Sequence, residues 1–298
     1  MPAKILPAKA PEAFQEAKAA ISASDWVKAG SLLAGLLRLP PAVFPQENRL
    51  AATAALATCY IQIKDLEGAA KVFKQRAALV VSESDKKRLL ATAEALQEAK
   101  TPLGVDPAWQ FVQSYDDAIA AAMKWKADQL LTKAKEIGEK AQGLNNWLTM
   151  KRVADKALAQ LAEADLYSPG FSVLHKEEVL AALADNAIAG AEKAVKICTE
   201  ERKFNVTPYY INSAASLQHA RLYNEYAVRY LERRKAAEDA LKNLERLAQE
   251  YQVPALYQKR AEKIKTLLAQ LDELRYHEMV KGMPRKLRIM PRHLGAQF

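Results

Sequence analysis

The chain has 298 residues, of which 50% are hydrophobic and 7% aromatic, and it carries a formal net charge of +9. Abundant alanine, only 10 glycines and few β-branched residues in alternation predict closely packed helices and exclude a fold built on β-sheets. The two cysteines, Cys59 and Cys198, lie far apart within helical patterns, which excludes a disulfide framework and a cysteine-based metal cluster.

The start of the sequence carries no targeting signal. Residues 1–7 lack the apolar stretch of a signal peptide, and no uninterrupted apolar run reaches the length that crosses a membrane. We therefore expect a cytoplasmic protein with no membrane span. A signal peptide removed from this sequence would leave no trace in it.

Residues 11–39 predict a first helical hairpin. Its turn lies at residues 22–25, where serine and aspartate side chains are suited to cap the second helix. Small residues at Ala17 and Ala29 let the two helices approach closely, and Pro41 follows the end of the second helix.

Residues 50–83 predict a second hairpin with the same pattern and a turn at residues 65–68. The residues that set the pattern are small and large apolar residues on facing helices: Leu56, Ala57, Tyr60, Ala69 and Phe73. Each hairpin presents an apolar face that only a neighbouring hairpin covers.

Together, the two hairpins resemble the tetratricopeptide repeat (TPR) over residues 10–83. The equivalent positions Ala29 and Ala69 are 40 residues apart, against about 34 in the family, and the extra residues fit the loop at 40–45. Ala13 and Thr53 occupy the position at which the family has Trp or Leu, so the motif is degenerate.

The resemblance implies an all-α, TPR-like α-solenoid of antiparallel helical hairpins with a concave, protein-binding groove. The residues that would line this groove are Phe14, Lys18, Ile21, Ala54, Thr58 and Ile61. Family members that hold a peptide's C-terminal carboxylate use Lys, Arg and Asn at these places, and only Lys18 is of that kind here. The resemblance therefore implies a groove for an apolar helix or peptide, which belongs either to a partner or to the next segment of this chain.

A third helix is expected from Asp85 to about Lys100, where the segment 101–104 stops it. Asp106 and Pro107 then suit the start of another helix, as its N-cap and its first helical residue. We therefore expect a domain boundary here, with the TPR-like hairpins at 1–103.

The middle of the chain continues the helical pattern without the family motif. The expected helices span residues 107–142, 144–166 and 172–202. Together they form irregular hairpins that continue the array over residues 104–206.

The C-terminal third follows a heptad pattern. After a helix start at Thr207 and Pro208, apolar residues recur at steps of three and four, interrupted at Arg234. They are Tyr223, Ala227, Tyr230, Ala237, Leu241, Leu244, Ala248 and Tyr251 and, after a break at 252–254, Tyr257, Ala261, Ile264, Leu268 and Leu271. The short break predicts a long antiparallel hairpin at 207–280, a coiled coil that would serve as a docking arm. The seam closes either within the hairpin or between two chains, so the oligomeric state stays open.

The last segment, residues 281–298, is a basic tail without acidic residues. Its cations are Lys281, Arg285, Lys286, Arg288 and Arg292, and removing these five charges from +9 leaves +4 for the rest of the chain. Such a tail suits phosphates, an anionic membrane surface or an acidic groove of a partner, or it is a solubilising end.

No pattern indicates catalysis, a metal or a cofactor. His175 has only Glu178 at a helical step that suits a shared metal, and His219 is six residues from Glu225. The sequence has no Gly-x-Ser-x-Gly motif and no phosphate-binding glycine loop.

The sequence therefore predicts a soluble, non-enzymatic scaffold or adaptor that binds protein partners through its groove and its helical arm. The alternative is a protein associated with nucleic acid or ribonucleoprotein through the basic tail. An enzyme whose groups converge from distant positions would need a polar pocket, which a sequence does not reveal.

Overall fold

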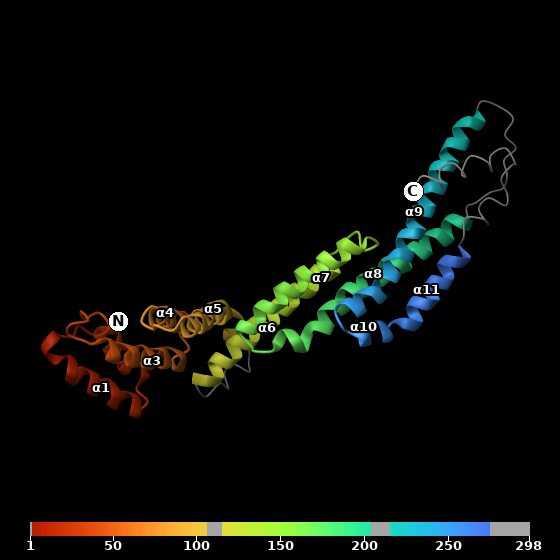
Figure 1. Ribbon diagram of the computed structural model, residues 1–298. Helices are drawn as coiled ribbons and strands as arrows, with labels where there is room; N and C mark the ends of the chain where they lie inside the picture. Colours follow the sequence, from red (N-terminus) through yellow and green to blue (C-terminus); the bar gives the residue numbers. More distant parts are fainter. Residues whose placement is uncertain (1, 106–114, 204–214, 275–298) are drawn as a thin grey trace. The chain divides into compact units, whose positions relative to one another are not determined.

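The computed structural model describes residues 2–105, 115–203 and 215–274 (Figure 1). These residues are helical almost throughout and contain no strand, which confirms the all-α class. None of the described helices is both long and apolar enough to cross a membrane.

Contacts divide the chain into two compact units. Unit 1 contains the described residues up to Thr132 together with Gln160–Leu174, and unit 2 contains Lys133–Ala159 together with the described residues from His175 onward. The divisions fall inside three helices: α6 (Tyr115–Glu139), α7 (Trp147–Ala162) and α8 (Phe171–Lys203). By contrast, the predicted boundary at 103/104 lies within α5 (Glu83–Val105), and the predicted boundary at 206/207 lies outside the described residues.

Unit 1 begins with helices that pack on their neighbours in the chain. They are η1 (Pro7–Lys9), α1 (Ala10–Ser22), α2 (Trp26–Leu36), α3 (Gln46–Gln62), α4 (Leu66–Ala77) and α5 (Figure 1). Small residues allow this close packing, since Ala17, Ala29 and Ala69 are fully buried. Phe73 is buried as well, whereas Tyr60 is half-buried and reaches the surface.

The two predicted hairpin turns are capped in the same way. The Asp25 carboxylate accepts a hydrogen bond from the Lys28 amide at 3.1 Å, and the Asp65 carboxylate accepts one from the Gly68 amide at 2.8 Å. Each aspartate thereby satisfies a backbone donor at the start of the following helix. The capping expected at residues 22–25 is therefore present, and its carrier is Asp25.

The helix before each of these turns also ends in the same way. Ser24 and Lys64 adopt the left-handed backbone conformation, with φ of 58° and 62°, and the next residue donates its amide to the carbonyl five positions earlier at 2.8 Å. This is the Schellman ending of a helix. A third such ending closes α9 (Ala215–Glu250) in unit 2, where Gln252 has φ of 55°.

α5 is longer than predicted. It runs to Val105, past Pro102 and beyond the expected end at Lys100. The expected end was wrong, because Pro102 does not stop the helix although a proline lacks an N–H and its ring crowds the carbonyl four residues earlier.

Unit 2 has a large apolar core and a smaller cluster formed by Cys198, Tyr230 and Leu274. Its helices are the second part of α6, the first part of α7, most of α8, α9, α10 (Pro254–Gln258) and α11 (Ala261–Glu273). The largest fully buried side chains of this core are Met150, Leu180, Leu183, Leu241, Leu244, Leu247 and Leu256.

The predicted heptad residues of α9 and α11 contribute to this core. The break at 252–254 is present, and Leu241, Ile264 and Leu271 are fully buried. The side chains of Tyr223 and Ala227 lie outside the described part. Because α7 and α8 share the same core, α9 to α11 are not a free-standing arm.

The backbones of α6 and α8 nearly touch in unit 2 at Gly138. A Cβ at this position would lie 2.9 Å from the Leu183 amide nitrogen and 3.1 Å from the Leu183 Cα. The Asn186 side-chain amide donates to the carbonyl oxygens of Gly138 and Ala141 at 2.8 and 2.9 Å, which satisfies acceptors at the end of α6. This helix crossing therefore depends on glycine at position 138.

Candidate protein-binding surface

The predicted groove residues on α1 are partly covered by other parts of unit 1, and Lys18 is exposed. Phe14 is half-buried, and the ring of Phe44 packs edge-on against it at a centroid distance of 5.4 Å. The Lys18 ammonium lies 4.6 Å from the centre of the Phe14 ring. Phe44 comes from the connecting loop at 40–45, so the extra residues of that loop fill space beside α1. Ile21 is half-buried.

Of the predicted groove residues on α3, Ala54 and Thr58 are half-buried and Ile61 is buried. Ile61 is only 3% exposed, and Thr58 donates its hydroxyl to the Ala54 carbonyl at 3.2 Å. Within α1 to α5, close packing joins chain neighbours, and α1 with α3 is not such a pair. The placement of Ile61 in an open groove is therefore corrected, because this side chain belongs to the core between helices.

Two hollows instead lie on the side of unit 1 formed by α2, α3 and α4. The α2–α3 hollow has a volume of about 630 Å³, and the α3–α4 hollow has a volume of about 490 Å³. Three residues line both hollows: Pro2, Ala34 and Tyr60. The two hollows are thus neighbouring parts of one surface.

The α2–α3 hollow has an apolar wall that is open to solvent. Trp26 and Tyr60 line it as half-buried aromatic residues, and Val27 and Ile63 line it with exposed fractions of 70% and 41%. Large apolar side chains at this exposure are typical of binding surfaces when they gather in a concave site.

The charged groups of the α2–α3 hollow are engaged in local contacts. Asp25 caps α2, and the Lys28 ammonium lies 2.8 Å from the Glu16 carboxylate. Cys59 also lines the hollow, where burial raises the pKa of its thiol to about 11, so the sulfur stays protonated at neutral pH and is a poor nucleophile. The hollow therefore offers mainly apolar contact, with its charged groups already engaged.

The α3–α4 hollow has cations on its wall that also have partners. The Arg49 guanidinium donates to the carbonyl oxygens of Leu39 and Leu37 at 2.7 and 2.8 Å, just beyond the end of α2. Lys71 pairs with Glu67 at 3.0 Å. These contacts shape the hollow rather than present charge to a ligand.

A cluster of charged residues joins α5, α6 and the segment after η3 (Glu163–Leu166) within unit 1. The side chain of Lys126 is 7% exposed, and its ammonium lies 3.0 Å from Glu94 and 2.7 Å from Glu98. The Tyr167 hydroxyl donates to Glu94 at 2.9 Å.

This charged cluster is suited to structure rather than to catalysis. Burial disfavours the charge of Lys126, but hydrogen bonds and attraction from Glu98 and Glu94 outweigh it and raise the pKa of the ammonium. Burial likewise opposes the charge of Glu94, and the bonds from Lys126 and Tyr167 outweigh it and lower the pKa of that carboxyl. The ammonium therefore stays protonated, and its pairs with Glu94 and Glu98 hold α6 against α5 within unit 1.

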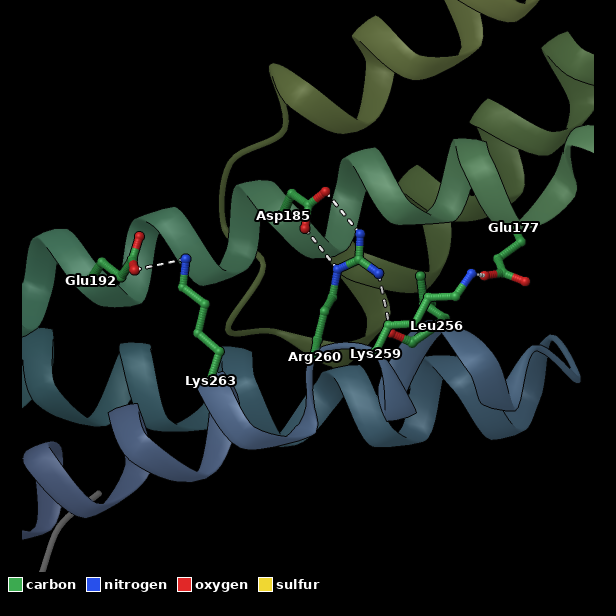
Figure 2. Close-up of polar contacts among 7 residues, drawn as sticks. All are labelled: Glu177, Asp185, Glu192, Leu256, Lys259, Arg260 and Lys263. Atoms are coloured by element: carbon green, nitrogen blue, oxygen red, sulfur yellow. Dashed lines mark hydrogen bonds and ion pairs between the residues drawn. The ribbon is translucent and has the colours of Figure 1, made fainter.

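Charged residues also join α8 to the α10–α11 segment in unit 2 (Figure 2). The pairs are Glu177 with Lys259 at 2.7 Å, Asp185 with Arg260 at 2.7 Å and Glu192 with Lys263 at 2.8 Å. All three anions lie on α8 and all three cations on the facing segment. The Arg260 guanidinium makes a second bond to Asp185 at 2.9 Å and so holds the joint between α10 and α11 against α8.

A groove of about 590 Å³ lies between α6 and α8 in unit 2. Its floor consists of alanines, and its charged walls are largely paired, with Lys135 at 2.8 Å from Glu178. It offers no large apolar side chain to anchor a partner. The α2–α3 hollow is therefore the stronger candidate.

The residues considered for metal binding and the basic tail are described to different extents. Among the described residues, no group of three His, Cys, Asp or Glu side chains is placed to hold a metal ion. The His175 Nδ1 atom lies 2.9 Å from Glu178, in a local contact on α8. His219 and the basic tail at 281–298 lie outside the part that is described at side-chain level.

Comparison with protein-family models, with curated proteins and with solved structures finds no match for this chain. Function is therefore argued from the residues themselves. Trp26, Val27 and Ile63 escaped the sequence prediction, because each lies next to a hairpin turn where helical periodicity gives no signal. The sequence does contain one indication of them: a large apolar residue stands next to Asp25 or Lys64, in a turn between helices where polar residues are usual.

Proposed function

We propose that the protein is a non-enzymatic scaffold that binds protein partners through the hollows on α2, α3 and α4. The observation that carries this proposal is the exposure of Val27 and Ile63 in a concave site whose charges are already engaged. Apolar anchors that become buried supply most of the affinity at protein interfaces. A partner side chain inserted between these two residues would gain that burial.

The TPR-like architecture is part of the same proposal. Asp25 and Asp65 form identical corners at the spacing that sequence alone assigned to the repeat. Because each corner leaves so few residues between helices, α2 is expected to return along α1, and α4 along α3. Arrays of such antiparallel hairpins serve as extended binding surfaces. The same reasoning supports an antiparallel arrangement of α9 with α10 and α11.

The scaffold proposal is tested by placing charge in the α2–α3 hollow. The double substitution Val27→Glu with Ile63→Glu should weaken partner binding at least tenfold, because the carboxylates would lose hydration in an apolar contact. Partner capture from the protein's own cell extract, quantified by mass spectrometry, measures this loss.

The matched control for this experiment is Val81→Glu. Val81 is 94% exposed and lines neither hollow. Equal partner recovery with the double variant and with Val81→Glu would contradict the proposal.

A second candidate function, nucleic-acid association, is favoured by the uneven charge of the chain. Residues 1–132 and 160–174 contain 16 basic and 16 acidic residues, whereas the remaining residues contain 28 basic and 19 acidic ones. The whole net charge of +9 therefore lies in the sequence of unit 2 and its basic tail. Such asymmetry favours a polyanionic partner on that part of the chain.

The nucleic-acid candidate predicts a steep salt dependence that the basic tail supports. Deleting residues 281–298 should flatten the plot of log affinity for single-stranded RNA against log salt concentration by about 0.7 for each phosphate contact removed. Fluorescence anisotropy over a salt series measures the slope. An unchanged slope after deletion would rule out the tail as the binding element, and protein partners that survive nuclease would favour the scaffold.

A further inference from the structure

Residues 2–6 lie along α2 without forming a helix. The Ala3 amide donates to the Ser31 carbonyl of α2 at 2.9 Å. Pro2, Ala3 and Ile5 are half-buried, whereas Lys4 and Leu6 are exposed. From Ala3 onward this alternation is that of an extended chain with one side laid on a surface.

The surface that receives this segment is shaped by Gly35 of α2. A Cβ at position 35 would collide with the carbonyl oxygen of Ala3 and lie 2.9 Å from the Cδ1 atom of Ile5. Glycine in a helix is destabilising relative to alanine, and the φ of Gly35 is not in the left-handed region that glycine alone favours. The close approach of an extended chain is what this glycine permits.

The occupied part of this surface continues into the two hollows. Pro2 lines both of them, and Ala3 lines the α2–α3 hollow together with Ser31 and Ala34. One surface therefore holds an extended segment of the chain itself and, beside it, open apolar space. The same surface contains Val27 and Ile63.

We propose that residues 2–6 are a built-in competitor, which occupies the site where an extended peptide of a partner binds. The inference rests on the proposed scaffold function and names its partner class. That partner presents a backbone amide to the Ser31 carbonyl, a small residue beside Gly35, and a branched apolar residue two positions later. The partner's remaining residues enter the α2–α3 hollow, and binding requires that residues 2–6 leave.

The segment is held in a way that permits such exchange. Its main-chain bond to Ser31 is a single amide-to-carbonyl bond, and a partner peptide of the same chemistry would replace it. Strand addition to a sheet edge uses the same kind of main-chain bonding with pockets for alternate side chains, and here the acceptor is a carbonyl of α2.

The test uses the full chain and a labelled peptide with the sequence of residues 2–7. Ala3→Pro removes the amide donor of the built-in segment and leaves α2 unchanged. The peptide should bind the Ala3→Pro chain at least tenfold more tightly than the wild-type chain, as measured by fluorescence anisotropy. Adding Gly35→Val to Ala3→Pro should abolish this binding, and Lys4→Ala should bind the peptide as the wild type does.

Two further measurements keep the outcome clear. A peptide with N-methylalanine at the position of Ala3 should bind the Ala3→Pro chain at least tenfold more weakly, and this result does not depend on the folding of a Gly35 variant. Equal peptide binding by wild type and Ala3→Pro, including no binding by either, would overturn the proposal. Light scattering provides the second measurement. If the wild-type chain is a dimer and Ala3→Pro makes it a monomer, the proposal is also overturned, because the occupant of the site would then be a second copy of the chain.

Failure of this inference is separable from failure of the proposed function. If partner capture depends on Val27 and Ile63 but the peptide does not bind the Ala3→Pro chain, the competitor is refuted and the scaffold stands. If the peptide binds as expected but partner capture is indifferent to Val27 and Ile63, the scaffold assignment fails and the occupied site on α2 remains.

Discussion

At the scale of single residues, the helix corners use a strained backbone without glycine. Ser24, Lys64 and Gln252 all adopt a left-handed φ. Residues with a Cβ in this conformation cost about 1–2 kcal/mol, so the three corners lower the stability of the protein. The strain persists because the left-handed residue turns the chain, so that the residue after it becomes the N-cap of the next helix.

The first prediction concerns this strain. Ser24→Gly should raise the free energy of unfolding by about 1 kcal/mol, since the relief of strain exceeds the added freedom of the unfolded chain. Urea denaturation followed by circular dichroism measures the change. Ser24→Ala is the control and should give no gain, because alanine keeps the Cβ; equal stabilisation by both variants would show that the conformation is not the cause.

At the scale of helices, the crossing of α6 and α8 in unit 2 predicts opposite effects of two similar substitutions. Gly138→Ala should destabilise the protein by about 1–3 kcal/mol, because its Cβ would be forced against the Leu183 backbone. Gly190→Ala should stabilise it by about 0.5–1 kcal/mol, because a Cβ at position 190 meets nothing within 4 Å and alanine favours the helix. Thermal unfolding of the two variants compares them, and a shift of the same sign in both would refute the crossing.

The charged cluster between α5 and α6 predicts that removing its cation weakens the pH dependence of stability. In the wild type, the folded-state pKa of Glu94 is lowered, so its contribution to stability is present above the unfolded pKa and is lost as the pH falls through the folded pKa. Lys126→Met removes the cation but leaves the bond from Tyr167 to oppose burial, so the pKa of Glu94 should move up toward its usual value and the variant should lose less stability than the wild type as the pH falls from 7 to 5.

The size of this effect is limited by the exposure of the carboxylates. Glu94 and Glu98 have side-chain exposures of 51% and 44%, so we expect Lys126→Met to cost about 1–2 kcal/mol at pH 7, below the cost of breaking a fully buried pair. Chemical denaturation at pH 5 and 7 measures both quantities. The control is Lys71→Met, which removes an exposed pair with Glu67 and should leave the pH dependence as in the wild type.

The helices and their corners were largely predictable, because their signals are local. Asp25 and Asp65 each follow a helical apolar pattern and precede another, and aspartate at that place caps a helix. The Lys126 cluster and the Gly138 crossing were not predictable, because Glu94, Lys126 and Tyr167 are distant in sequence and no spacing rule relates them. The hollows belong to the same class, since Pro2 and Ile63 meet only after α2 and α3 have packed.

At the scale of the whole molecule, the two units differ in chemistry. Unit 1 carries the apolar hollows and a sequence with balanced charge, and the sequence of unit 2 carries the whole net charge. The prediction of four segments divided the chain at its loops, whereas contacts divide it inside α6, α7 and α8. The sequence could not predict these divisions, because a compact unit is defined by contacts between residues that are distant in the sequence.

The packing of Phe44 against Phe14 has a consequence for anyone who would build with this protein. The loop at 40–45 lengthens the spacing of the two hairpins, and the ring it supplies is 2% exposed. The loop therefore contributes to the interior of unit 1, and deleting its residues would remove a buried ring. A shorter connection between α2 and α3 that lacks Phe44 would expose Phe14, so the length of this loop is tied to the packing of α1.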